Sequence, residues 1–120
     1  MAHILVVDDE AEIRSMIAEY LARAGHVTTQ AADGREAMMY VRAKRPDLVI
    51  TDIHMPEWDG IQLILALTHE GIRVPVIAMT GVPPDTVPYL RIARGLGAVR
   101  VLAKPFAMAK LMEQVAEVIS

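Results

Sequence analysis

Five short apolar segments alternate with segments of helical periodicity, and this alternation constrains the fold more than any other feature of the sequence. Strands are expected at residues 3–7, 26–31, 48–52, 75–79 and 99–103. The central one contains the run Leu48, Val49 and Ile50, which suits a strand buried on both faces. Because strands that alternate with helices pair in parallel, the pattern predicts a three-layer α/β fold with a five-stranded parallel sheet. We expect the flavodoxin-like strand order 2-1-3-4-5, with the more polar second strand at an edge.

The helices between these strands are predicted from apolar spacing and from residues that start or stop helices. They are one ending at Gly25, one from Asp33 to Arg45 and Pro46, one from Asp59 to Gly71, one from near Pro88 to Gly95 or Gly97, and one over 108–119. In the third of these, one face carries Ile61, Ile64, Leu65 and Thr68, and another carries Leu63 and Leu67. This helix is therefore either deeply buried or offers a small apolar patch, and burial is the preferred interpretation.

Composition narrows the class of protein. The chain has 120 residues, 53% of them hydrophobic and only 4% aromatic, which allows one domain with a large aliphatic core. Cysteine is absent, which fits a reducing compartment and excludes thiol chemistry, Fe–S clusters and cysteine-ligated zinc. No apolar run is long enough to span a bilayer and no secretory signal is evident, so a cytoplasmic location without membrane contact is expected. The net charge of −3, without a basic block, argues against nucleic-acid binding.

Acidic residues follow two strands that the predicted order makes neighbours. Asp8 and Asp9 end the first strand, and Asp52 ends the third, shortly before Pro56. Two carboxylates about 4 Å apart repel by about 4 kcal/mol at an effective dielectric near 20, so such a group needs a compensating cation. Hard divalent cations bind sites of oxygen ligands, and Mg²⁺ is the best match, with Mn²⁺ as a possible substitute. The alternative is that these acids point into solvent as helix caps.

Two further strand ends are expected to complete the same site. Thr80 ends the fourth strand with a hydroxyl group, and Lys104 follows the fifth with an ammonium group. Each alone has a plain explanation, as a turn residue or a surface lysine, but both fall at the edge of the sheet that carries the acids. Pro105 is a candidate cis-proline that would direct Lys104 inward.

Four motifs carry a resemblance along the whole chain to the receiver domain of bacterial response regulators, in particular single-domain, chemotaxis-regulator-like members of two-component systems. The motifs are ILVVDDE at 4–10, DLVITDIHMPEWDG at 47–60, VIAMTG at 76–81 and LAKPF at 102–106. The resemblance implies that residues 1–120 form one receiver domain without an effector domain. It also implies a protein that catalyses only its own phosphorylation and dephosphorylation, and is not an enzyme acting on other substrates.

The resemblance further implies roles for the residues at the strand ends. Asp52 would accept a phosphoryl group from a sensor histidine kinase or a histidine phosphotransferase. Asp9 and Asp52 would bind Mg²⁺ directly, helped by the backbone carbonyl of His54, with Asp8 acting mostly through water. Because a phosphoryl group adds negative charge, the modified protein is expected to signal to a downstream protein target by altered docking of its helix 4, strand 5 and helix 5 face.

Thr80 and Lys104 would contact the phosphoryl oxygens, and three nearby positions bear on how the signal arises. Val101 stands where receivers often carry an aromatic switch residue, so signalling by a swinging ring is in doubt. His54 and Val82 lie two residues past Asp52 and Thr80, and we expect them to tune the lifetime of the phosphoryl group. A solvent-facing loop histidine is an equally good interpretation of His54.

Three competing functions remain to be weighed. A phosphate-independent binding module on the same fold is disfavoured because every acidic, hydroxyl and lysine position is retained. A flavodoxin-like electron carrier needs a loop of small hydroxyl residues or glycines after the first strand, where the acidic run 8–10 would repel the flavin phosphate. An aspartyl phosphatase places its nucleophile after the first strand in a D-x-D arrangement, which this chain lacks.

Overall fold

A computed structural model describes residues 2–53, 59–81 and 98–119 of the chain. All five strands pair in parallel in the order β2-β1-β3-β4-β5, which confirms the predicted sheet. The strands are β1 (His3–Val7), β2 (Val27–Ala31), β3 (Leu48–Asp52), β4 (Val76–Thr80) and β5 (Ala98–Ala103). Their bounds agree with the sequence prediction to within one residue, because each apolar run ends at a turn residue or a polar group.

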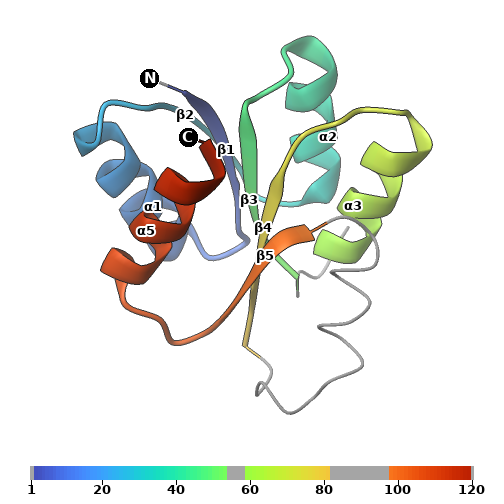
Figure 1. Ribbon diagram of the computed structural model, residues 1–120. Helices are drawn as coiled ribbons and strands as arrows, with labels where there is room; N and C mark the ends of the chain where they lie inside the picture. Colours follow the sequence, from blue (N-terminus) through green and yellow to red (C-terminus); the bar gives the residue numbers. More distant parts are fainter. Residues whose placement is uncertain (1, 54–58, 82–97, 120) are drawn as a thin grey trace.

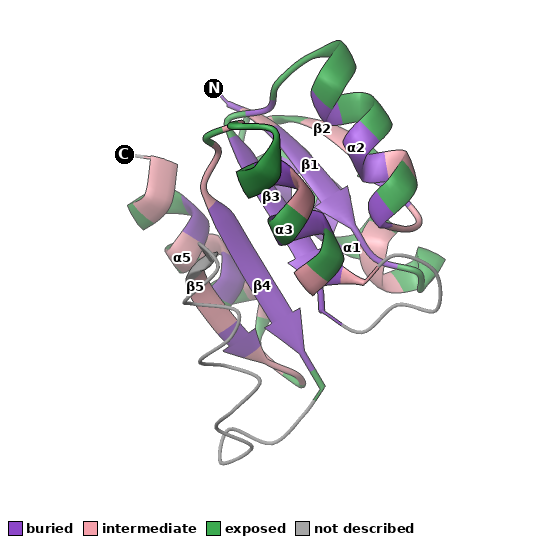
Figure 2. Ribbon diagram, turned by 90° about the vertical axis from the view of Figure 1, so that its right-hand side faces the viewer, coloured by how far each residue is buried: buried purple, intermediate pink, exposed green. Residues whose placement is uncertain are grey.

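Helices cover both faces of the sheet and give three layers (Figure 1). The helices α1 (Ala11–Arg23) and α5 (Met108–Ile119) lie on one face, and α2 (Gly34–Ala43) and α3 (Gly60–His69) lie on the other (Figure 1). Each face has its own buried apolar cluster, one around Ile17, Ile50 and Leu111, the other around Val49 and Leu63. Every residue of β3 and β4 is buried, as Figure 2 shows, whereas the edge strand β2 is mostly exposed or half-buried.

The helix ends follow the predicted signals. Asp59 and Gln62 form a reciprocal capping box at the start of α3, because each side chain accepts from the backbone N–H of the other. Gly25 and Gly71 follow α1 and α3 with φ of 93° and 69°, in the left-handed region that glycine adopts readily. The predicted helix from Pro88 lies outside the described residues, as does the loop that precedes it from residue 82.

Of the two apolar faces of α3 that the sequence offers, the one with Leu63 and Leu67 packs in the core. Leu63, Ile64 and Leu67 enter the core, whereas Leu65 is 47% exposed and Thr68 is exposed as well. The expectation that this helix is buried is therefore correct for the Leu63 side and wrong for Leu65. Apolar residues surround the helix, so spacing alone could not select the side that packs on the sheet.

Candidate functional site

The polar residues singled out in the sequence gather where the parallel strands end. Asp52 and Thr80 are the last residues of β3 and β4, and Asp8 and Lys104 directly follow β1 and β5. Backbone hydrogen bonds continue the ladder past the strand ends, because Ile53 N–H donates to the Met79 carbonyl at 2.8 Å and Lys104 N–H to the Thr80 carbonyl at 2.6 Å. The fold therefore fixes the backbone from which these side chains emerge.

Lys104 bridges two buried carboxylates. Its Nζ lies 3.0 Å from Asp52 Oδ2 and 3.3 Å from Asp8 Oδ2. The side chains of Asp8 and Asp52 are 0% and 7% exposed, and that of Lys104 is 19% exposed. Charged hydrogen bonds in such a shielded setting are stronger than the same contacts at the surface. The peptide bond between Lys104 and Pro105 is cis, as the sequence predicts.

Burial and charge shift the proton affinities of two of these groups. Burial raises the pKa of Asp8, and the hydrogen bond from Glu10 N–H and the charge of Lys104 only partly offset this. Burial acts to lower the pKa of Lys104, but the hydrogen bond and charge of Asp52, together with Asp8, outweigh it and raise that pKa. The ammonium group is therefore held in its charged form between the acids.

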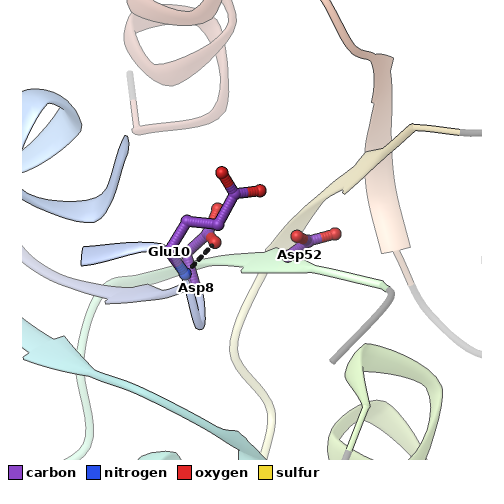
Figure 3. A group of neighbouring side chains, drawn as sticks. All are labelled: Asp8, Glu10 and Asp52. Carbon is purple, nitrogen blue, oxygen red and sulfur yellow. Dashed lines mark hydrogen bonds between the residues drawn. The ribbon is translucent and has the colours of Figure 1, made fainter. Parts of the chain in front are cut away.

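Three carboxylates form a group able to hold a metal ion. Asp8, Glu10 and Asp52 each offer an oxygen, and these oxygens lie within 4.8 Å of one another. Figure 3 shows Glu10 and Asp8 on one side and Asp52 on the other, with Glu10 N–H donating to Asp8 Oδ1 at 2.9 Å. An all-oxygen set of this charge fits a hard divalent cation such as Mg²⁺ and does not suit a soft metal.

The outcome differs among the predicted metal ligands. Asp8 and Asp52 are in the carboxylate group, and Glu10, the last residue of the acidic run at 8–10, joins them. Asp9 is exposed and is not part of this group among the described residues, so its direct coordination stays a prediction. The carbonyl of His54 and the tuning positions His54 and Val82 lie outside the described residues.

Thr80 and Val101 have well-defined surroundings. Thr80 is fully buried at the end of β4, beside Ala103 of β5 in the strand register. Val101 is half-buried and packs against the apolar cluster on the α2 and α3 face. A β-branched side chain therefore occupies the position at which an aromatic switch was considered, and its contacts are those of a core residue.

Arg14 contributes to the site in a way that sequence reasoning missed. Its Nη1 donates to the backbone carbonyl of Asp8 at 2.6 Å, and its Nε donates to Gln30 Oε1 at 3.2 Å. The guanidinium group thus ties the acidic turn after β1 to the end of β2. The only sequence signal is an arginine one helical turn into α1, which is also what an ordinary surface arginine would give.

The chain matches the family model described as the response regulator receiver domain over residues 4–116. It belongs to this family. The receiver fold, the strand order and the acidic site at the carboxyl ends of the strands agree with that membership. None of the described helices is both long and apolar enough to cross a membrane.

Curated relatives include response regulators, transcriptional regulatory proteins, a phosphotransferase and a protein-glutamate methylesterase. The receiver is 39% identical over 115 residues to the response regulator GtcR of Aneurinibacillus migulanus, covering 92% of this chain and 46% of that protein. It is 34% identical over 114 residues to the sporulation initiation phosphotransferase F of Bacillus subtilis, covering 93% of this chain and 89% of that protein. The chain spans about half the length of three curated relatives, the first of which is GtcR, and covers 46% of each of them.

Solved structures have the same architecture. The receiver domain of a Francisella response regulator superposes with a TM-score of 0.91 at 29% identity, covering 99% of this chain and 97% of that one. The superposition covers nearly all of both chains, so the two proteins share the fold.

Proposed function

We propose that the receiver accepts a phosphoryl group on Asp52 in a Mg²⁺-dependent reaction. The observation that carries this proposal is the Lys104 ammonium 3.0 Å from the Asp52 carboxylate, inside a buried acidic group at the carboxyl ends of the strands. Phosphoryl transfer depends on positioning and on neutralising charge, and this arrangement supplies both. Family membership supports the same reading.

The described donor set fits the metal that the family implies. Asp52, Asp8 and Glu10 would hold it, together with Asp9 and the His54 carbonyl if those predictions are correct. When bound, Mg²⁺, or Mn²⁺ in its place, would supply positive charge to the phosphoryl oxygens. It would also relieve the repulsion among the acids, which Lys104 alone balances only in part.

The chain's own residues would act around Asp52. One Asp52 carboxylate oxygen attacks phosphorus, and the donor atom leaves on the opposite side. Lys104 would then pair with the phosphoryl group, whose charge is about −2 where Asp52 had −1. The Thr80 hydroxyl, at the end of the neighbouring strand β4, would donate to a phosphoryl oxygen after a small movement of that strand end. These movements would couple the modification to β4 and β5.

The partners that we propose follow from this chemistry. The donor would be a sensor histidine kinase or a histidine phosphotransferase, and this proposal is supported by the similarity to the sporulation initiation phosphotransferase F of Bacillus subtilis. The output would be altered docking on the face that includes β5 and α5. Family membership gives no support to the electron carrier or the aspartyl phosphatase. A cytoplasmic location and the absence of an effector domain stay predictions.

Incubation with a small phosphodonor and Mg²⁺, followed by intact-protein mass spectrometry, tests the proposal. We expect the mass of one phosphoryl group to be added, Asp52→Asn to abolish it and chelation of Mg²⁺ to prevent it. Glu12→Gln is the matched control, because Glu12 is an exposed carboxylate outside the acidic group. If the wild type stays unmodified, the proposal is wrong and a phosphate-independent binding module is the better description. If Asp52→Asn is still modified, Asp52 is not the acceptor and the proposal is wrong as well.

A further inference from the structure

The acidic turn at residues 8–10 is held at both ends by one residue, Arg14. Its backbone N–H donates to the Glu10 carbonyl at 3.0 Å, and its guanidinium Nη1 donates to the Asp8 carbonyl at 2.6 Å. Asp8 and Glu10 supply two of the three carboxylates in the acidic group. The proposed function gives this group a metal ion but leaves Arg14 without a role.

The guanidinium group is itself fixed at a second point. Its Nε donates to Gln30 Oε1 at 3.2 Å, and Gln30 lies in β2, which pairs with β1. Arg14 is half-buried, and its planar guanidinium presents its donors in a rigid fork. Two contacts made by one rigid group therefore define where the Asp8 carbonyl lies relative to the edge of the sheet.

We propose that Arg14 is a positioning residue that fixes the acidic turn and thereby raises the preference of the acidic group for Mg²⁺ relative to Ca²⁺. The inference rests on the proposed function, because it concerns the metal ion of the same site. Mg²⁺ requires near-octahedral oxygen ligands at about 2.0–2.1 Å, whereas Ca²⁺ accepts a more flexible arrangement at about 2.3–2.6 Å. A turn that is held in place therefore favours the small ion more than the large one.

The charge of Arg14 acts against its effect on geometry, and the two can be separated. A positive charge beside the acidic group repels a divalent cation, and it repels Mg²⁺ and Ca²⁺ alike because both ions carry the same charge. Loss of the charge would tighten the binding of both ions, whereas loss of the hydrogen bonds would weaken the binding of Mg²⁺ above all. The ratio of the two dissociation constants therefore cancels the charge effect and reports the positioning.

Titration of the full chain with each ion, followed through its backbone amide NMR signals, measures both dissociation constants. Removing an outer partner of a metal ligand costs about 10–100-fold in metal affinity. Because Arg14 acts through the backbone of the ligand residues, we expect the lower end of this range. In Arg14→Met the dissociation constant should rise about 10-fold for Mg²⁺ and by no more than about 3-fold for Ca²⁺. Arg14→Lys keeps the charge but lacks the rigid fork, so its ratio should lie between those of Arg14→Met and the wild type.

Two further variants complete the experiment. Arg23→Met is the matched control, because Arg23 lies on the same helix and the substitution removes the same charge, but its guanidinium is paired with Glu19 at the surface. It should leave the ratio of the two constants as in the wild type. Gln30→Met keeps Arg14 and removes only its contact with β2, so it should shift the ratio in the same direction as Arg14→Met but less. It decides the question if Arg14→Met does not fold.

The outcomes separate this inference from the proposed function. If Arg14→Met and Gln30→Met keep the wild-type ratio, Arg14 does not set the geometry of the turn, and the inference is overturned while the proposed function stands. If Arg14→Met binds both ions more tightly by the same factor, only its charge matters and the inference is overturned as well. If the wild type takes up no Mg²⁺, the proposed function itself fails and this inference fails with it.

Discussion

Replacing Gly60 by alanine tests how the end of β3, which carries the proposed acceptor Asp52, is held in place. Gly60 opens α3, and its N–H donates to the Ile53 carbonyl at 3.0 Å, directly after the last residue of β3. A Cβ atom at Gly60 would lie 2.6 Å from the Asp52 carbonyl oxygen and 2.9 Å from Ile53 Cα. Both contacts are with backbone that is paired in the sheet, so no flexible side chain can move aside.

The expected magnitude comes from two opposing effects. Alanine is better than glycine within a helix by up to about 1 kcal/mol. Overpacking against fixed backbone costs about 1–3 kcal/mol, and here the overlap falls on Asp52, the proposed phosphoryl acceptor. We therefore expect Gly60→Ala to lower the free energy of unfolding by about 1–2 kcal/mol. Displacing Asp52 should also slow phosphorylation, since an error of about 1 Å in a reacting group can cost about 100-fold in rate.

Urea unfolding at fixed pH measures the first effect, and the rate of mass increase with a phosphodonor measures the second. Gly81→Ala is the control, because a Cβ there meets nothing within 4 Å and Gly81 has no positive φ. That variant should be as stable as the wild type or slightly more so. If Gly60→Ala is as stable as the wild type and is phosphorylated at the same rate, the close approach of α3 to β3 does not position Asp52.

Three further predictions concern charge and capping. Asp8→Asn should stabilise the metal-free protein by about 1–2 kcal/mol in urea unfolding, because it removes a carboxylate charge that is unfavourable chiefly through its burial and also through repulsion from Asp52; destabilisation would contradict this. Asp59→Ala should lower the free energy of unfolding by about 1 kcal/mol in the same assay, and an unchanged midpoint would show that the cap of α3 contributes nothing. The hydrogen bond from Arg42 lowers the pKa of Glu70, so the stability that this pair contributes is present above the ordinary carboxylate pKa and is lost as pH falls through the lowered value. The stability difference between the wild type and Glu70→Gln should therefore shrink between about pH 6 and pH 3, and a difference that grows on acidification would contradict the assignment.

The sheet and the acids at its centre were predictable because the apolar runs that form single strands agree with the strand–helix alternation that sets the topology. Leu48, Val49 and Ile50 form a run that only a buried strand accommodates, and the alternation with helices leaves few strand orders. Once the order is known, Asp52 and Lys104 must emerge at the same edge. The sequence therefore predicts that these side chains meet at one edge of the sheet, and the structure adds the ion pair between Lys104 and Asp52.

Other features depend on side-chain directions that residue spacing does not encode. Leu65 and Leu63 are equally apolar, and only the packing of α3 on the sheet decides which is buried. Glu10 belongs to the acidic group, whereas Asp9 was the residue predicted to bind the metal ion. The backbone turns after Asp8, where Glu10 N–H donates to Asp8 Oδ1, and residue spacing does not show this turn. Arg14 looks like a solvent-exposed helix residue until the Asp8 carbonyl is seen within its reach.

Lys104 links strand ends to one another in addition to balancing the charge of the acids. A single ammonium group, attached where β5 ends, fastens the tips of β1 and β3 through their carboxylates. Because β4 lies between β3 and β5, these contacts link the ends of strands across the sheet from β5 to β1. Lys104 directly follows β5 in the chain. A change in the group that pairs with its ammonium would therefore act on the end of β5 directly, without intervening side chains.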